Sequence, residues 1–318
     1  MPQSVLPAIV ALLLPVGEEG YSLPLGLLAV LIVAIAHLSM NLFDDYFDFQ
    51  TRGNEIREEL EQQGERARIA KSPYLVSGEV TPQRLFVVAS LFALTALLLG
   101  LIIVWQRGVT CLYIAGIAGF LGYFYSGRPL RLSYHGLGEL IIGTVFGPLL
   151  MCGVYYATIG HLGHEILYLS CAIGLLVINI LFTHSILDYK PDIANGKRTL
   201  AAVLQRQDLN LTACALFNFT PYLLILVAVI THTLSPLFLI TWLILPLSVY
   251  LFYLMIQFCH HPEKEFPRQW WFGPIEHWKE IQEAKLEWFA IRWFLARNIL
   301  QWISLLIIAC SIIRAILK

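Results

Sequence analysis

The stretch LPLGLLAVLIVAIAHLSMNLFDDYFDFQ, residues 23–50, begins as a continuous apolar segment and ends with three aspartates within five positions. A helix of about 20 apolar residues crosses the hydrocarbon core of a bilayer, so residues 23–48 are predicted to form a transmembrane helix. A carboxylate at the edge of a hydrocarbon layer is costly unless another group compensates its charge. The three aspartates therefore predict a compensating partner at the membrane surface.

The composition of the whole chain is that of a membrane protein. Of its 318 residues, 58% are hydrophobic and 14% are charged, and the mean hydropathy is +0.68. We expect an all-α, polytopic membrane helical bundle with about nine transmembrane helices in a single domain, 1–318. The apolar segments lie at 4–17, 23–48, 85–105, 109–126, 136–158, 165–188, 210–232, 234–257 and 293–316. The net charge of −1 predicts no nucleic-acid partner, and no obligate protein partner is predicted.

The distribution of basic residues predicts the orientation of these helices. Four longer polar segments, 49–84, 127–135, 189–209 and 258–292, fall on one face if the chain crosses the membrane at each apolar segment. All of the 21 lysines and arginines lie on that face except Arg107, Arg314 and Lys318. The positive-inside rule makes the four segments cytoplasmic loops, with the N-terminus inside and the C-terminus outside a cell (inner) membrane.

The first acidic motif has the spacing of one helical face. Asn41, Asp44, Asp45 and Asp48 follow at i, i+3, i+4 and i+7, which places them in one stripe at the C-terminal end of a helix. The helix dipole disfavours negative charge at this end, so the stripe points to a bound cation. Oxygen ligands without histidine or cysteine suit Mg²⁺. A solvated helix end that carries acidic residues by chance is the alternative interpretation.

A second polar cluster is expected at the same membrane face. His184, Asp188 and Asp192 follow at four-residue steps where the segment 165–188 ends. Basic residues near the two acidic clusters are Lys71, Arg128, Arg131, Lys190, Lys197 and Arg198. Each could be ordinary positive-inside charge. Taken together, acidic residues that hold a metal and basic residues that bind oxyanions predict a diphosphate site.

These motifs resemble those of a known family. DDYFD (44–48) and DYKPD (188–192), together with YSGRPLRLSYHGLGE (125–139) and GKRTLA (196–201), resemble the UbiA superfamily of intramembrane aromatic prenyltransferases. The resemblance implies a Mg²⁺-dependent enzyme whose partners are a polyprenyl diphosphate, an aromatic acceptor and the lipid bilayer. The implied catalytic and metal-binding residues are Asp45, Asp48, Asp188 and Asp192. The implied substrate-binding residues are Asn41, Asp44, Lys71, Arg128, Arg131, Lys197 and His184.

The chain departs from the family pattern at two positions in these motifs. Asp44 stands where the family usually has asparagine. Pro191 lies inside the second motif, where it removes a helical hydrogen bond and disfavours a helical Lys190.

The acceptor is suggested by a narrower resemblance. The pattern GLGE–FGP–G–Y in residues 136–156 looks like that of the menaquinone branch, the 1,4-dihydroxy-2-naphthoate polyprenyltransferases. It implies prenyl transfer with decarboxylation to give demethylmenaquinone. Another acceptor such as 4-hydroxybenzoate, and a cation-coupled transporter, remain alternatives. A transporter would place its acids near the middle of the bilayer, and a CDP-alcohol phosphotransferase would need an Asp-Gly pair that the chain lacks.

The last polar segment is rich in tryptophan. Apolar residues recur at three- and four-residue spacing from Ile275 to Ile291, with glutamates and lysines between them. This pattern predicts an amphipathic helix that lies on the membrane surface.

Overall fold

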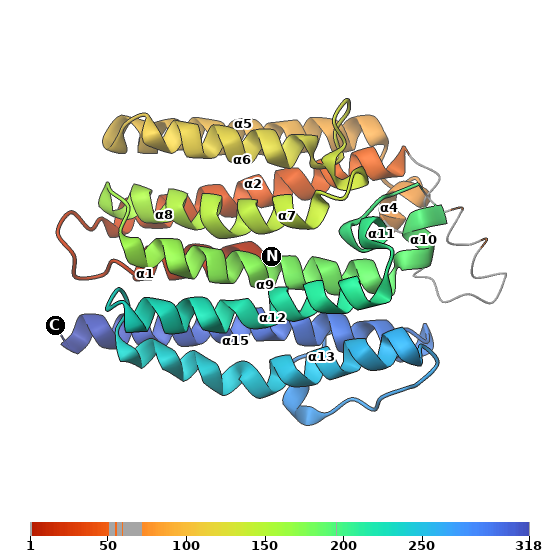
Figure 1. Ribbon diagram of the computed structural model, residues 1–318. Helices are drawn as coiled ribbons and strands as arrows, with labels where there is room; N and C mark the ends of the chain where they lie inside the picture. Colours follow the sequence, from red (N-terminus) through yellow and green to blue (C-terminus); the bar gives the residue numbers. More distant parts are fainter. Residues whose placement is uncertain (1, 51–54, 56–58, 60–71, 195, 318) are drawn as a thin grey trace.

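The long helices of the protein run side by side in one bundle (Figure 1). The computed structural model describes residues 2–50, 55, 59, 72–194 and 196–317. Within these ranges the chain contains helices but no β-strand, and His135 and Arg198 form an isolated bridge. The predicted all-α class is confirmed.

The apolar segments form the helices of the bundle. The long ones are α2 (Leu23–Phe49), α5 (Pro82–Arg107), α6 (Thr110–Ser126), α9 (His164–Leu187), α12 (Gln207–Ile230), α13 (Leu245–His260) and α15 (Glu287–Leu317). A further span is made of α7 (Gly138–Thr144), the π-helix η2 (Val145–Leu149) and α8 (Leu150–Ile159), and the 3₁₀ helix η3 (Pro236–Ile244) leads into α13. The short elements are α1 (Pro2–Leu13), α4 (Pro73–Val76), η1 (Leu132–Tyr134), α10 (Tyr189–Ala194), α11 (Leu200–Leu204), η4 (Trp270–Phe272) and α14 (Trp278–Glu283).

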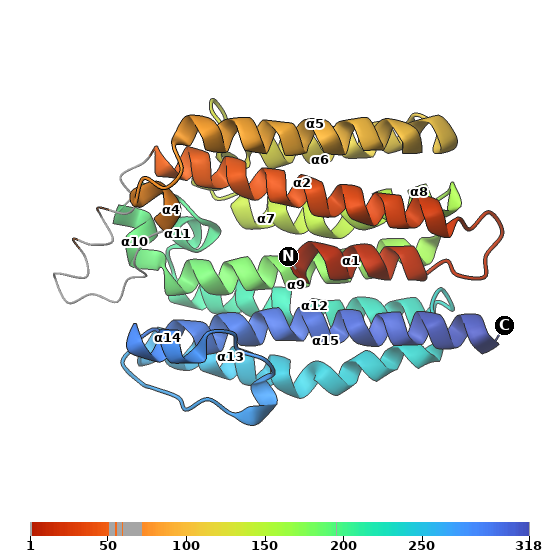
Figure 2. The same ribbon diagram turned by 180° about the vertical axis from the view of Figure 1, so that it is seen from behind.

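The expected count of nine transmembrane helices is not confirmed. In the described part of the chain, seven helices are long and apolar enough to cross a membrane. The other two apolar helices, α1 and α6, have 12 and 17 residues. At 1.5 Å per residue α1 extends only about 18 Å. It lies beside the half of the bundle farther from α4 and α10 (Figure 2).

Helix α9 is the centre of the bundle. In its most apolar window 72% of the residues are buried, the largest share among the candidate spans. Glycines allow α7 and η2 to lie directly against α9. A Cβ added to Gly147 would be 2.5 Å from the Cα of Gly174 on α9, and a Cβ added to Gly143 would be 2.8 Å from the carbonyl oxygen of Gly174. Small residues allow such close packing where lipid supplies no hydrophobic drive between helices.

Buried amides hold the next two helices against α9. The side chain of Asn179 donates to that of Asn218 at 3.1 Å, and Asn218 donates to the backbone oxygen of Ser248 at 2.7 Å. This chain of hydrogen bonds joins α9, α12 and α13 at positions that are all fully or almost fully buried.

The predicted surface helix from Ile275 to Ile291 is wrong as a single element. Helix α14 ends at Glu283, and α15 begins separately at Glu287. Lys285 between them has a φ of 54°, which a helix cannot include. Several of the periodic apolar residues do face the protein, although Ala284 is exposed. They do not belong to one helix: Ile275, which precedes α14, forms a small cluster with Ala290 and Phe294 of α15.

We expect Gly147→Val to destabilise the bundle, because the added side chain would overlap the backbone of α9. The expected loss is about 1–3 kcal/mol, the usual effect of overpacking. Thermal unfolding of the purified protein in detergent measures it. Gly116→Val is the matched control, because nothing lies within 4 Å of a Cβ at that position. Equal melting temperatures for the two variants would contradict the prediction.

Candidate active site

The two aspartate motifs meet at one end of the bundle. The C-terminal end of α2 lies there beside α4, α10 and α11, as seen on the right of Figure 1. The bridge between His135 and Arg198 brings the segment after α6 against the segment that leads into α11. Residues 44–48, 131–135, 188–194 and 196–198 therefore share one site.

The carboxylates of the first motif have different partners. The hydroxyl groups of Ser72 and Tyr74 donate to the two oxygens of Asp45 at 2.7 and 2.5 Å. Burial and the hydrogen bond to Asp45 raise the pKa of Tyr74 to about 12, so the phenol remains a donor at neutral pH. Successive helix positions differ by about 100°, which is why Asp45 reaches α4 while Asp44 faces another neighbour.

Asp44 and Asp48 face residues at and after the end of α6, and the lysine that follows the second motif. The hydroxyl of Ser126 donates to Asp44, and the hydroxyl of Tyr134 donates to Asp48 at 3.1 Å. Burial lowers the pKa of Lys197, but the carboxylates of Asp48, Asp192 and Asp44 outweigh it and raise that pKa above its ordinary value. Lys197 is therefore a fixed cation among three acids.

Two cationic side chains also lie over the aromatic ring of Tyr134. The guanidinium carbon of Arg131 lies 3.8 Å from the ring centroid, and the ammonium of Lys197 lies 5.7 Å from it. Such contacts hold cations in place without consuming all their hydrogen-bond donors. Arg131 and Lys197, both predicted substrate-binding residues, are thus brought together at one side chain.

The second motif folds differently from a continuous helix. Helix α9 ends at Leu187, and α10 begins at Tyr189, so Pro191 falls in the first turn of a new helix. A proline there removes an N–H that has no helical partner in any case. Asp192 remains one turn beyond Asp188, with its N–H donating to the Asp188 carbonyl at 2.9 Å.

The carboxylate of Asp188 is fully buried. One of its oxygens lies 3.3 Å from Nε2 of His184, whose side chain is 24% exposed. The backbone N–H of Lys197 donates to the Asp192 carbonyl at 2.8 Å, which closes the turn between the motif and its lysine.

Two predicted residues take no part in the contacts described above. Asn41 is exposed one turn before it and is hydrogen-bonded to His37. Arg128 is exposed on the loop after α6. Lys71 lies outside the described residues.

Glu139 is a polar residue of the site that the sequence analysis did not single out. It is 3% exposed, and it accepts hydrogen bonds from the hydroxyl of Ser185 at 2.6 Å and from the N–H of Leu200 at 3.1 Å. It therefore joins α7 to α9 and holds the segment that carries Lys197. A lone glutamate at the start of an apolar segment was the available sequence signal. Ser72, Tyr74, Ser126 and Tyr134, the hydroxyl donors to the aspartates, were missed as well.

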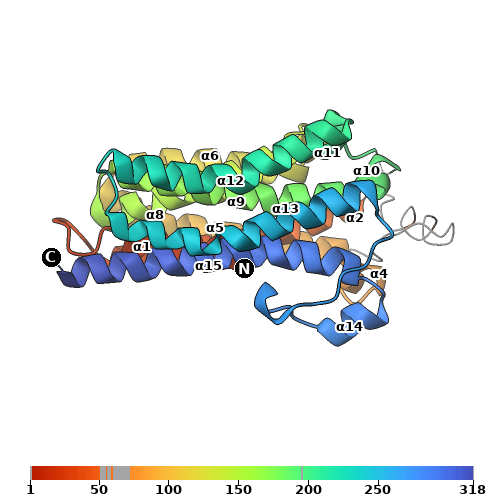
Figure 3. The same ribbon diagram turned by 60° about the horizontal axis from the view of Figure 1, so that its bottom comes forward.

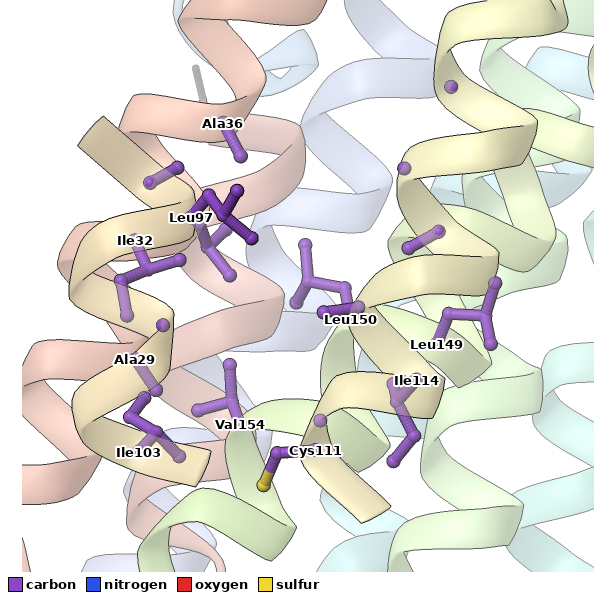
Figure 4. A pocket seen from close by; sticks show the side chains of 18 of the residues that line it. Ala29, Ile32, Ala36, Leu97, Ile103, Cys111, Ile114, Leu149, Leu150 and Val154 are labelled. Atoms are coloured by element: carbon purple, nitrogen blue, oxygen red, sulfur yellow. The ribbon is translucent and has the colours of Figure 1, made fainter. Parts of the chain in front are cut away.

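An apolar cavity begins one helical turn below these acids. Its volume is about 370 Å³, and it lies between α2, α5, α6 and α8. Figure 4 shows Ile32, Leu97, Ile114 and Leu150 pointing into it from these helices. Met40 and Gly122 line its upper end. Met40 lies four residues before Asp44, and Gly122 lies four residues before Ser126, the residue that donates a hydrogen bond to Asp44.

A comparison with protein families accounts for this combination of a polar mouth and an apolar cavity. The model of the UbiA prenyltransferase family matches residues 4–273. The chain belongs to the UbiA prenyltransferase family. The resemblance inferred from the two aspartate motifs is confirmed, and the chain is a multi-pass membrane protein of this family.

Two UbiA-type relatives are named for acceptors that contain a naphthalene-derived ring, a naphthoquinone and a naphthoate. The chain is 32% identical over 196 residues to 2-carboxy-1,4-naphthoquinone phytyltransferase of Synechocystis sp., covering 60% of this chain and 59% of the relative. It is 26% identical over 213 residues to 1,4-dihydroxy-2-naphthoate octaprenyltransferase of Bacillus subtilis, covering 67% and 65%. The matched region thus spans less than two thirds of each relative.

Solved UbiA structures share the fold at low sequence identity. A structure of digeranylgeranylglyceryl phosphate synthase aligns with a TM-score of 0.62 at 18% identity, covering 97% of this chain and 93% of the other. A UbiA homolog from Archaeoglobus fulgidus bound to GPP and Mg²⁺ aligns with a TM-score of 0.54 at 15% identity, covering 98% and 94%.

The acids of this UbiA-type site fit the magnesium ion that the family implies. The predicted metal ligands Asp45, Asp48, Asp188 and Asp192 offer carboxylate oxygens, with no thiolate among them. Mg²⁺ prefers such oxygen ligands, and it typically takes one or two carboxylates and completes its shell with water and phosphate oxygens. In the described ranges, no three His, Cys, Asp or Glu side chains converge tightly enough to form a metal centre by themselves.

We expect Glu139→Ala to loosen the segment that carries Lys197. The substitution leaves the part-buried Leu200 N–H and the buried Ser185 hydroxyl without this acceptor, which costs about 1–3 kcal/mol. The measurements are the melting temperature and the rate of tryptic cleavage after Lys197 and Arg198. Glu139→Gln keeps an acceptor oxygen and is the matched control. Equal cleavage rates for the alanine and glutamine variants would show that this carboxylate does not hold the segment.

Proposed function

We propose that the chain transfers a polyprenyl group from polyprenyl diphosphate to 1,4-dihydroxy-2-naphthoate, with loss of the carboxylate as CO₂, giving demethylmenaquinone. The observation that carries the proposal is the junction of an acid–lysine site and an apolar cavity one helical turn apart. A prenyl diphosphate has the same two parts, a multiply charged head and a hydrocarbon tail. The charge asymmetry of the loops supports a site that opens to the cytoplasm.

The polar end of the site suits the diphosphate. When bound, Mg²⁺ would be held by the aspartates of the two motifs and would neutralise the leaving group. Lys197 and Arg131, fixed at the Tyr134 ring, would donate to its oxygens. Negative charge grows on these oxygens as the C–O bond breaks, so cations that are already in place stabilise the transition state most.

The cavity suits the prenyl tail. It extends along α2 from Met40 to Ala29, eleven residues or about 16 Å of helix. Its lining includes Leu97, Leu101 and Leu112, which are 54%, 49% and 40% exposed, so it also opens toward the surrounding lipid. A tail can therefore leave the bilayer and enter the cavity without crossing water.

The acceptor is inferred from the relatives and from the sequence pattern after the basic loop. Two relatives are named for naphthoquinone or naphthoate acceptors. The electron-rich ring of a dihydroxynaphthoate can attack an allylic cation. Its carboxylate would face Arg131 and Lys197 rather than the apolar cavity. A different aromatic acceptor would leave the donor site unchanged, so the acceptor is tested separately.

The acceptor is tested by incubating the purified protein with geranylgeranyl diphosphate, Mg²⁺ and one acceptor at a time. We expect a prenylated, decarboxylated product from 1,4-dihydroxy-2-naphthoate and none from 4-hydroxybenzoate or homogentisate. Mass spectrometry of the extracted lipid identifies the product. Prenylation of 4-hydroxybenzoate or homogentisate, without prenylation of 1,4-dihydroxy-2-naphthoate, would refute the naphthoate assignment. It would still support prenyl transfer as the reaction.

The metal role is tested by removing carboxylates one at a time. Asp48→Asn and Asp188→Asn should each lower kcat by on the order of 10²-fold or more, because the leaving-group charge is then less well neutralised. Chelation with EDTA should abolish turnover, and added Mg²⁺ should restore it. Asp208→Asn, in an exposed pair with Arg206, is the control and should keep full activity. Turnover in the presence of chelator would contradict the metal role.

The tail-binding role of the cavity is tested by filling it. We expect Gly119→Phe to raise KM for geranylgeranyl diphosphate, since Gly119 lines the cavity and nothing lies within 4 Å of a Cβ there. Gly116→Phe is the matched control, on the same helix with equal free space but outside the cavity lining. If both variants have the same KM, the tail binds elsewhere.

A further inference from the structure

The segment between α13 and α15 has an uncharged tip between two charged shoulders. The tip is the run WWFGPI, Trp270–Ile275, which includes η4. The charged residues of the two shoulders are Glu263, Lys264, Glu265, Arg268, Glu276, Lys279, Glu280, Glu283 and Lys285. Figure 3 shows this segment and α14 projecting from the bundle on the side of α13 and α15.

The tip is fixed to the outer side of these two helices. The side-chain amide of Asn298 on α15 donates to the carbonyl oxygens of Phe272 and Pro274 at 2.8 and 3.0 Å. The Trp271 ring lies 4.8 Å from the Tyr250 ring on α13. The tip is thus held from both helices.

The contacts also give the depth of the tip along the bundle. Phe289 on α15 contacts the ring of His184, one turn before the end of α9, so α15 begins at the level of the acidic site. Asn298 lies eleven residues beyond Glu287, and Tyr250 lies ten residues before His260. At 1.5 Å per residue, the tip is about 15 Å from that end toward the middle of the bundle (Figure 2).

The surface beside the tip is of the kind that faces lipid. Trp270 is 90% exposed. Val249 on α13 and Trp302 on α15 are 53% and 41% exposed, and both lie on helices long and apolar enough to span a membrane. The tip therefore continues a lipid-facing surface rather than a water-facing one.

Part of the backbone at the tip is hydrogen-bonded within the protein. Non-helical backbone in hydrocarbon is costly unless its polar groups are bonded within the protein. Asn298 satisfies two carbonyls, the Phe272 N–H donates to the Gln269 carbonyl at 3.2 Å, and Pro274 has no N–H. The adjacent carboxylate, Glu276, lies 3.2 Å from the guanidinium of Arg297, which neutralises its charge.

We propose that the tip Trp270–Ile275 is inserted into the acyl-chain region of the leaflet on the acidic side of the bundle, with its two charged shoulders among the lipid headgroups. The shoulders carry four basic and five acidic residues. Insertion therefore depends on apolar burial and requires no anionic lipid. The tip is a fixed lipid anchor beside the start of α15.

Tryptophan fluorescence in lipid vesicles tests the proposal. The protein is reconstituted in phosphatidylcholine, and the emission of Trp270→Phe is subtracted from that of the wild type to isolate Trp270. Lipids brominated on the acyl chain should quench most of this difference emission, and aqueous iodide should quench little of it. Trp105→Phe provides the control, because Trp105 on the spanning helix α5 is 88% exposed and should behave in the same way.

The other outcomes overturn the proposal. Quenching by iodide but not by brominated lipid would place the tip in water. Quenching by neither would mean that a second copy or another protein covers it. Quenching by brominated lipid that appears only when the vesicles also contain anionic phosphatidylglycerol would mean that charge draws the tip to the surface. Asn298→Ala is a second arm: it removes the donor to two tip carbonyls and should shift the Trp270 signal from lipid quenching toward iodide quenching.

Discussion

The ammonium group of Lys197 among the carboxylates of Asp44, Asp48 and Asp192 is the interaction on which the rest of the site depends. Three carboxylates at one membrane-proximal position repel each other, and two of them stand at the end of α2 that its dipole makes negative. A cation is therefore needed among them in the free protein. Lys197 supplies it from a segment more than 140 residues later in the chain.

Placing that lysine requires much of the bundle. Its segment is held by the Asp192 carbonyl, by the bridge between His135 and Arg198, and by Glu139 at the start of α7. Glu139 in turn depends on the close contact of α7 with α9 that the glycines permit. Helix packing deep in the membrane and charge placement at its surface are therefore parts of one arrangement.

The sequence predicts the fold class, the helices and the meeting of the two motifs, because hydrophobic segments and i, i+4 spacing are local properties. It does not predict that Asp45 turns to α4, since the pattern treats all three aspartates of the stripe alike. Glu139 was missed because its partners, Ser185 and Leu200, are distant in the chain. The surface helix was predicted wrongly because apolar periodicity continues across Lys285, where the backbone breaks. Pro191 does not disturb the second motif, because a new helix begins there.

The direction in which a substrate lies is set by a single helix. From Ala29 to Met40, α2 presents mainly apolar residues to the cavity, with His37 and Ser39 as the polar exceptions, and from Asn41 to Asp48 it carries the polar stripe. Both belong to one continuous helix, so the distance and the angle between the apolar part and the acidic part are fixed by helical geometry. A molecule whose head is charged and whose tail is hydrocarbon can occupy this site in one orientation only. For the proposed prenyl diphosphate, that orientation would place the carbon next to the diphosphate at the boundary between the cavity and the acids. There the cations and an apolar wall would act on the same C–O bond.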